Sequence, residues 1–180
     1  MFPICMLALA GANIFVSIDF VEYYNFIALF IITHYILCVL LSRKFISRKD
    51  IRLSKFTSPP RLISIMLIVY LMFAISELAL PQIKDSVVVV VIVVASMILF
   101  VVTSFFIYLA NRYEKVIFLF IAACCALFIN GLLGLNELYY YNKIFTVLIN
   151  IAEGIGVYFF TRFFIEAKPV NNDFLNEKYF

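Results

Sequence analysis

Long apolar runs separated by short polar segments set the pattern of this chain of 180 residues. A run of about 20 apolar residues is what an α-helix needs to cross the hydrocarbon core of a bilayer. The run that opens VVVVVIVV is typical of a strand in water, but a lone strand in lipid leaves its backbone unpaired, so a helix is expected. The pattern therefore predicts an all-α polytopic membrane bundle of about six transmembrane helices, at residues 4–18, 24–41, 62–80, 87–110, 116–135 and 144–165.

One long polar segment, residues 42–61, interrupts the apolar runs. It carries seven basic residues against one acid, Asp50. Loops rich in Lys and Arg stay in the cytoplasm, so six helices predict cytoplasmic N- and C-termini. We divide the chain into a transmembrane domain, residues 1–166, and a flexible cytoplasmic tail, residues 167–180.

Composition supports a membrane protein. The chain is 66% hydrophobic and 14% charged, with a mean hydropathy of +1.08, and a soluble protein of this size could not bury so much apolar surface. The net charge of +3 does not indicate nucleic acid, because the excess lies in the basic segment 42–61. We expect that segment to meet anionic lipid headgroups, and membrane lipids to be the partners. The strong usage of Ile, Phe, Asn and Lys fits a bacterial inner-membrane protein of an AT-rich genome.

The first residues, MFPICMLALAGA, resemble the apolar part of a signal peptide. No basic region precedes this run, and Asn13 follows where a cleavage site would fall. We therefore expect a retained first helix.

The four cysteines, Cys5, Cys38, Cys124 and Cys125, all lie inside apolar runs. No CxxC motif is present, the chain has one histidine, and we found no Cys/His spacing typical of a metal site. We interpret these cysteines as small buried hydrophobic residues, and predict no metal and no cofactor.

Polar side chains inside the apolar runs are costly in a bilayer and need a reason. His34 and Glu153 lie near the middle of their predicted helices, so we predict that they form an acid–base pair able to activate water, with both as catalytic residues. The alternative is that the polar residues hold helices together, at about 0.6 kcal/mol per contact. The predicted polar pocket has four further members, Asn13, Asn130, Asn136 and Asn150.

The last predicted helix has a distinctive face. Asn150 and Glu153 are three residues apart and share one side of it. Gly154 and Gly156 lie beside them and would allow close approach of a neighbouring helix or a ligand. The side expected to face lipid carries Phe159 and Phe163.

A faint internal repeat links the two ends of the chain. YYNFI at residues 23–27 resembles YYNKI at residues 140–144. Asn13 and Asn130 lie twelve residues before the asparagine of their respective motifs. This spacing indicates a parallel repeat, in which the hairpin of the first two helices has the orientation of the hairpin of the last two.

Two stretches resemble the YhhN-like lysoplasmalogenase family of multi-pass membrane proteins. One is LALAGANIFVSIDF with NFIALFIITHYILCVLL, in which Asn13 stands at the aspartate of the family's Gly-Asp and His34 at the histidine of its Ala-His. The other is ALFINGLLGLNELYYYNKIF with LINIAEGIGVYFF, in which Gly131 stands at a second aspartate and Asn136 matches the asparagine of a Leu-Asn. In the final helix, Glu153 stands at the position of a tyrosine.

The resemblance implies a lipid-sized pocket and hydrolysis of the vinyl ether bond of lysoplasmalogens. Asn13 and Gly131 replace the two aspartates expected to do that chemistry, and a neutral amide cannot act as a general base. The favoured function is therefore lipid binding on this scaffold, with hydrolysis left open. The alternative is a small non-enzymatic membrane protein unrelated to the family: a partner subunit, a transporter-like protein or a defence-type protein.

Overall fold

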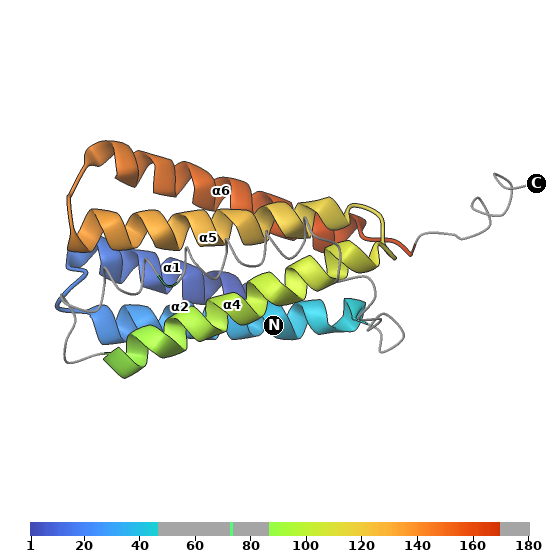
Figure 1. Cartoon of the computed structure of the whole chain (residues 1–180), viewed down its shortest axis with the longest axis horizontal. Helices are drawn as coiled ribbons and strands as arrows, with labels where there is room; N and C mark the ends of the chain where they lie inside the picture. Colours follow the sequence, from blue (N-terminus) through green and yellow to red (C-terminus); the bar gives the residue numbers. More distant parts are fainter. Residues whose placement is uncertain (47–72, 74–86, 170–180) are drawn as a thin grey trace, which may run out of the picture.

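The computed structural model describes residues 1–46, Phe73 and residues 87–169, and this part of the chain is all-helical. Five long helices form the bundle in Figure 1. They are α1 (Phe2–Ile18), α2 (Tyr24–Ser42), α4 (Val87–Ala110), α5 (Val116–Leu138) and α6 (Lys143–Glu166), and a short 3₁₀ helix, η1 (Arg43–Phe45), follows α2.

The predicted helices in this part of the chain are confirmed. α4 has the predicted bounds, and the other four differ from the prediction by one to three residues at their ends. Four helical segments are long and apolar enough to cross a membrane: Tyr24–Phe45, Val87–Ala110, Val116–Leu138 and Lys143–Glu166. The fifth, α1, has 17 residues and spans about 26 Å at 1.5 Å per residue. The predicted helix at residues 62–80 lies outside the described residues.

Local side chains set the turns between helices. Asp19 Oδ1 accepts hydrogen bonds from the N–H groups of Val21 and Glu22, both at 2.9 Å, in the turn between α1 and α2. Asn142 caps α6, because its side-chain oxygen accepts from the Ile144 N–H at 2.9 Å. α5 begins directly after Lys115, whose backbone takes a left-handed conformation (φ 62°).

The helices pack in the order α1, α2, α4, α5, α6, each against the next. The α1–α2 and α5–α6 turns lie together at one end of the bundle, on the left in Figure 1. We call this the acidic end, because it carries Asp19, Glu22 and Glu137 and one base, Lys143. The opposite, basic end is formed by η1, residues 111–115 and the end of α6, and its basic residues are Arg43, Lys44, Arg112, Lys115, Arg162 and Lys168, with Glu114 and Glu166 as its acids.

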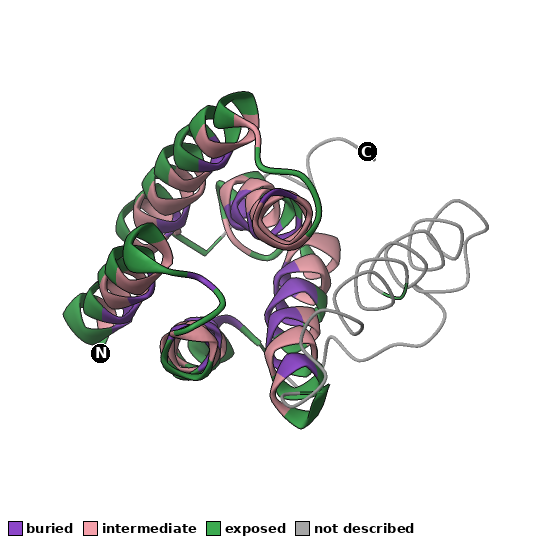
Figure 2. Cartoon of the chain, turned by 90° about the vertical axis from the view of Figure 1, so that its left-hand side faces the viewer, coloured by how far each residue is buried: buried purple, intermediate pink, exposed green. Residues whose placement is uncertain are grey.

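Polarity is distributed as expected for a protein dissolved in lipid. Large apolar side chains cover the outside, and more than half of the surface of each of these is exposed: Ile4, Leu7, Leu29, Val88, Val102 and Val147. Several polar side chains are buried instead: Ser42, Ser96, Thr103, Ser104 and Asn136. Figure 2 shows the buried positions turned toward neighbouring helices and the exposed ones turned outward. This arrangement supports a multi-pass membrane protein.

An aromatic cluster closes the basic end. The Phe45 ring of η1 lies 4.7 Å from that of Phe163 and 5.0 Å from that of Tyr113, centroid to centroid. The prediction that Phe163 faces lipid is wrong: its side chain is fully buried, because η1 folds back over it. Phe159 is half-buried, 5.1 Å from the ring of Phe118 on α5.

Candidate functional site

A cavity of about 650 Å³ lies among α1, α2, α5 and α6. α1 and α6 are the two ends of the helix order, and among the described helices they are not a closely packed pair. The six residues that the sequence indicated as a polar site all line this cavity: Asn13, His34, Asn130, Asn136, Asn150 and Glu153. Four different helices contribute them, so only the fold brings them together.

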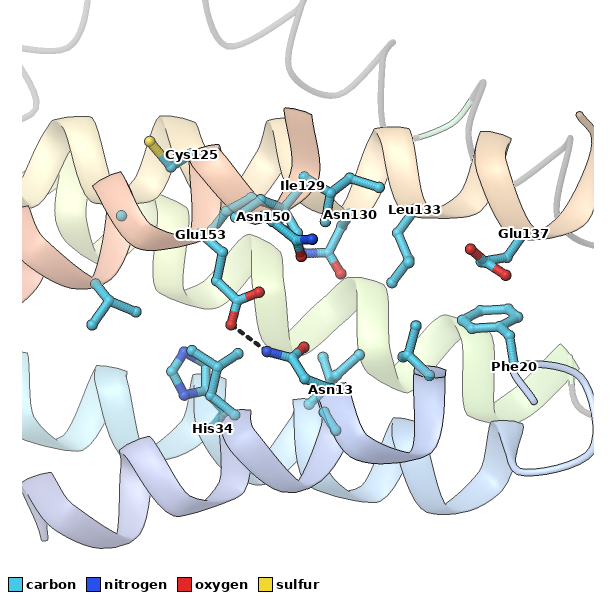
Figure 3. A pocket seen from close by; sticks show the side chains of 18 of the residues that line it. Asn13, Phe20, His34, Cys125, Ile129, Asn130, Leu133, Glu137, Asn150 and Glu153 are labelled. Atoms are coloured by element: carbon cyan, nitrogen blue, oxygen red, sulfur yellow. Dashed lines mark hydrogen bonds between the residues drawn. The ribbon is translucent and has the colours of Figure 1, made fainter. Parts of the chain in front are cut away.

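Glu153 is the central acidic group of the cavity. It reaches from α6 toward α1, where Asn13 Nδ2 donates a hydrogen bond to Glu153 Oε1 (Figure 3). This is a contact across the gap between two helices that otherwise pack loosely. A carboxylate inside a bilayer needs a hydrogen-bond donor, and Asn13 supplies one.

His34 lines the same cavity from α2 but has a different partner. Its Nδ1 lies 2.9 Å from the backbone carbonyl of Cys5 on α1, and its ring meets that of Tyr35 edge-on at 5.4 Å. In the described part of the chain no hydrogen bond joins His34 to Glu153; each side chain instead bonds to a residue of α1. The two groups share the cavity (Figure 3) without forming the direct contact that the predicted pair supposes.

Two of the asparagines connect elements of the bundle. Asn130 on α5 donates to the hydroxyl of Tyr35 on α2 and to the Ala126 carbonyl at 2.8 Å. Asn136 is 2% exposed and accepts from the Asn142 N–H at 2.9 Å, which ties the end of α5 to the start of α6. Both contacts fit the structural role that the sequence left open for the asparagines.

Asn150 differs from these two. It lies on α6 one turn from Glu153, lines the cavity and has an exposed side chain (Figure 3). Within the described residues its amide makes no hydrogen bond to another side chain or to the backbone. Its donor and acceptor therefore face the cavity, where they can meet a ligand.

Most of the rest of the lining is apolar, with acidic residues and a few hydroxyl and thiol side chains. Apolar side chains from several helices form the walls, among them Ile31, Phe100, Leu133, Val157 and Phe160. The charged lining residues are Asp19, Glu137 and Glu153, and the described lining contains no lysine or arginine. The cavity thus suits a ligand with a long apolar part and a polar part that carries no negative charge.

The structure also places two thiols beside His34, which sequence reasoning missed. Cys5 Sγ lies 3.3 Å from His34 Nδ1, and Cys38 Sγ lies 3.6 Å from Nε2. The expectation that no Cys/His spacing points to a metal site overlooked His34 and Cys38, which are four residues apart and share one helix face. Cys5 had no such signal, since only the α1–α2 packing brings it near.

The assignment of the cysteines to the protein interior holds for two of the four. Cys5 and Cys38 are buried, but Cys124 is exposed and Cys125 only half-buried. Cys124 is exposed on α5, which costs little because a cysteine is small and apolar enough to face lipid.

No family model, curated protein or solved structure matches this chain.

Proposed function

We propose that this chain is a multi-pass membrane protein whose cavity binds a single-chain lipid with a neutral or cationic head. The observation that carries the proposal is the cavity of about 650 Å³, whose walls are largely apolar and whose polar side chains carry amides, carboxylates, hydroxyls, thiols and one imidazole. Ligand cavities of about 300–1,000 Å³ take small molecules.

The charges of the lining select among lipid heads. Asp19, Glu137 and Glu153 would repel a carboxylate or a phosphate, and no described lysine or arginine in the lining would offset them. A hydroxyl or ammonium head can donate hydrogen bonds to Glu153 and to the amide oxygen of Asn150. The acyl chain would lie along the apolar walls toward Phe160.

Thermal stabilisation of the purified protein tests this proposal. We expect 1-monooleoylglycerol and a long-chain amine to raise the unfolding temperature, and oleate to have little effect. Asn150→Trp, which fills the cavity, should remove the response. Ile151→Trp is the matched control, because Ile151 is the next residue of α6 and is exposed on the outside. A response that is equal for all three lipids, or that survives Asn150→Trp, would contradict the proposal.

Hydrolysis of a lipid bound there is the second candidate, because His34 and Glu153 line the same cavity. A bound water between an imidazole and a carboxylate can be activated as a nucleophile. The resemblance to the YhhN-like family suggests lysoplasmalogen as the substrate; its head is zwitterionic, so its ammonium group, and not its phosphate, would have to face Asp19, Glu137 and Glu153. Release of aldehyde from a lysoplasmalogen, abolished by His34→Ala and by Glu153→Gln, would support an enzyme; binding without aldehyde release would leave a lipid-binding protein.

We also infer that the α1–α2 and α5–α6 hairpins are parallel repeats. Asn13, on the first helix of one hairpin, bonds to Glu153 on the second helix of the other. Asn130, on the first helix of the second hairpin, bonds to Tyr35 on the second helix of the first. This reciprocal pattern is what a two-fold axis along the membrane normal would produce.

A further inference from the structure

Three metal-ligating side chains meet where α1 packs on α2. The sulfur atoms of Cys5 and Cys38 are 3.3 Å apart. His34 completes the group, and one ligand atom from each of the three residues lies within 4.8 Å of the other two. Cys5 and Cys38 are buried, and His34 and Cys38 line the cavity.

The hydrogen bonds of His34 show which ring nitrogen is free to bind. The Cys5 carbonyl can only accept, so the Nδ1 atom 2.9 Å from it must be the protonated nitrogen. The proton on Nδ1 leaves the lone pair of the neutral ring on Nε2, which faces Cys38 Sγ at 3.6 Å. Metal-binding histidines commonly donate their other N–H to a backbone carbonyl in this way.

We propose that Cys5, His34 Nε2 and Cys38 bind a zinc ion. Two thiolates and a neutral imidazole around Zn²⁺ make a site without net charge, which suits the hydrocarbon interior better than a charged one. Binding releases the two thiol protons. Three protein ligands leave one coordination position, and because His34 and Cys38 line the cavity, that position opens toward it.

The separation of the two sulfur atoms needs only a small adjustment to accept the ion. Zn–S bonds of about 2.3 Å in a tetrahedral site place two sulfurs about 3.8 Å apart. The observed sulfur separation is 3.3 Å. Rotation of the Cys5 side chain about its Cα–Cβ bond would supply the difference, and it would also turn the Cys5 sulfur, now 3.3 Å from Nδ1, toward Nε2. This site does not depend on the proposed lipid ligand, since all its ligands belong to the protein.

Cobalt titration of the reduced, metal-free full-length protein tests the site. Co²⁺ takes the place of Zn²⁺ and absorbs strongly when bound to thiolate. We expect this absorption to saturate at one equivalent, and Zn²⁺ to abolish it. Cys5→Ser, Cys38→Ser and His34→Gln should each remove the saturable absorption. Cys124→Ser and Cys125→Ser are matched controls on α5 and should keep it.

A second measurement on the unchanged protein covers the case in which the serine variants fail to fold. Zn²⁺ should protect Cys5 and Cys38, but not the exposed Cys124, from a membrane-permeable maleimide. Absence of thiolate absorption, its retention in Cys5→Ser or Cys38→Ser, or equal labelling with and without Zn²⁺ would overturn the proposal. Oxidation of Cys5 and Cys38 to a disulfide, with no metal uptake by the reduced protein, would also overturn it.

Discussion

Glu153 and His34 each use α1 as their partner, although they come from α6 and α2. Glu153 accepts from the Asn13 amide, and His34 bonds to the Cys5 carbonyl. Each of the two groups that the sequence suggested as a pair therefore bonds to α1 and not to the other, although both line the same cavity.

A double-mutant cycle distinguishes the two possible partners of Glu153. Asn13→Leu combined with Glu153→Gln should show a coupling free energy of about 0.5–2 kcal/mol in thermal or denaturant unfolding in detergent, because the two side chains share a hydrogen bond between helices. His34→Ala combined with Glu153→Gln should show a smaller coupling, because no hydrogen bond joins them in the described structure.

The opposite ranking of the two cycles would contradict the structure at this position. A large coupling between His34 and Glu153, with none between Asn13 and Glu153, would mean that the carboxylate turns toward the imidazole. That result would restore the direct acid–base pair.

At the scale of one helix, α6 shows which glycine matters for packing. A Cβ atom added at Gly156 would lie 3.1 Å from Cys125 Cβ on α5, which is tighter than ordinary contact. A Cβ atom at Gly154 would meet nothing within 4 Å. The predicted close approach of a neighbouring helix therefore occurs at Gly156 and not at Gly154.

Leucine substitutions at the two glycines should separate these environments. We expect Gly156→Leu to lower the free energy of unfolding by about 1–3 kcal/mol, because it forces α6 away from α5. Gly154→Leu should be neutral or stabilising by up to about 1 kcal/mol, since it gains helix propensity without a clash. Thermal unfolding in detergent measures both, and equal destabilisation would show that α5 and α6 pack differently.

The end of α6 offers a second matched pair. Phe163 is fully buried under Phe45, whereas Ile165 is 72% exposed. Phe163→Ala should destabilise the protein by about 3–5 kcal/mol, since it leaves a cavity in the aromatic cluster. Ile165→Ala, measured in the same unfolding experiment, should change stability by about 0.5 kcal/mol or less. A neutral Phe163→Ala would mean that η1 does not fold over α6.

At the scale of the whole molecule, charge differs between the two ends of the bundle. Six described basic residues lie at the basic end and one, Lys143, at the acidic end. Because basic residues near the ends of membrane helices stay in the cytoplasm, we expect the basic end to be cytoplasmic. The segment at residues 42–61 begins at that same end.

Cysteine labelling in intact cells tests this orientation. A cysteine introduced by Tyr140→Cys, in the α5–α6 turn, should react with a membrane-impermeant maleimide added outside. Lys49→Cys and Lys178→Cys should react only after the membrane is opened. Labelling of Lys49→Cys or Lys178→Cys in intact cells would contradict cytoplasmic termini.

The sequence alone predicted the described helices and six polar residues of the cavity lining. Runs such as Val87–Ala110 read as helices because lipid offers the backbone no other hydrogen-bond partner. Asn13, His34 and Glu153 stood out because polar groups in a bilayer are rare and costly. Both the apolar runs and the polar residues within them can be recognised from the local sequence, without knowledge of the fold.

Only the tertiary structure decided which faces turn inward and which side chains meet. In a soluble protein, the difference between a polar face and an apolar face of a helix predicts which side is buried. In α6, Asn150 and Glu153 indicated the cavity side, but most of the remaining residues of the helix are apolar on the outward and inward faces alike, so the burial of Phe163 was not encoded in the pattern. The meeting of Cys5 with His34 depends in the same way on the packing of α1 against α2, because these two residues are 29 positions apart.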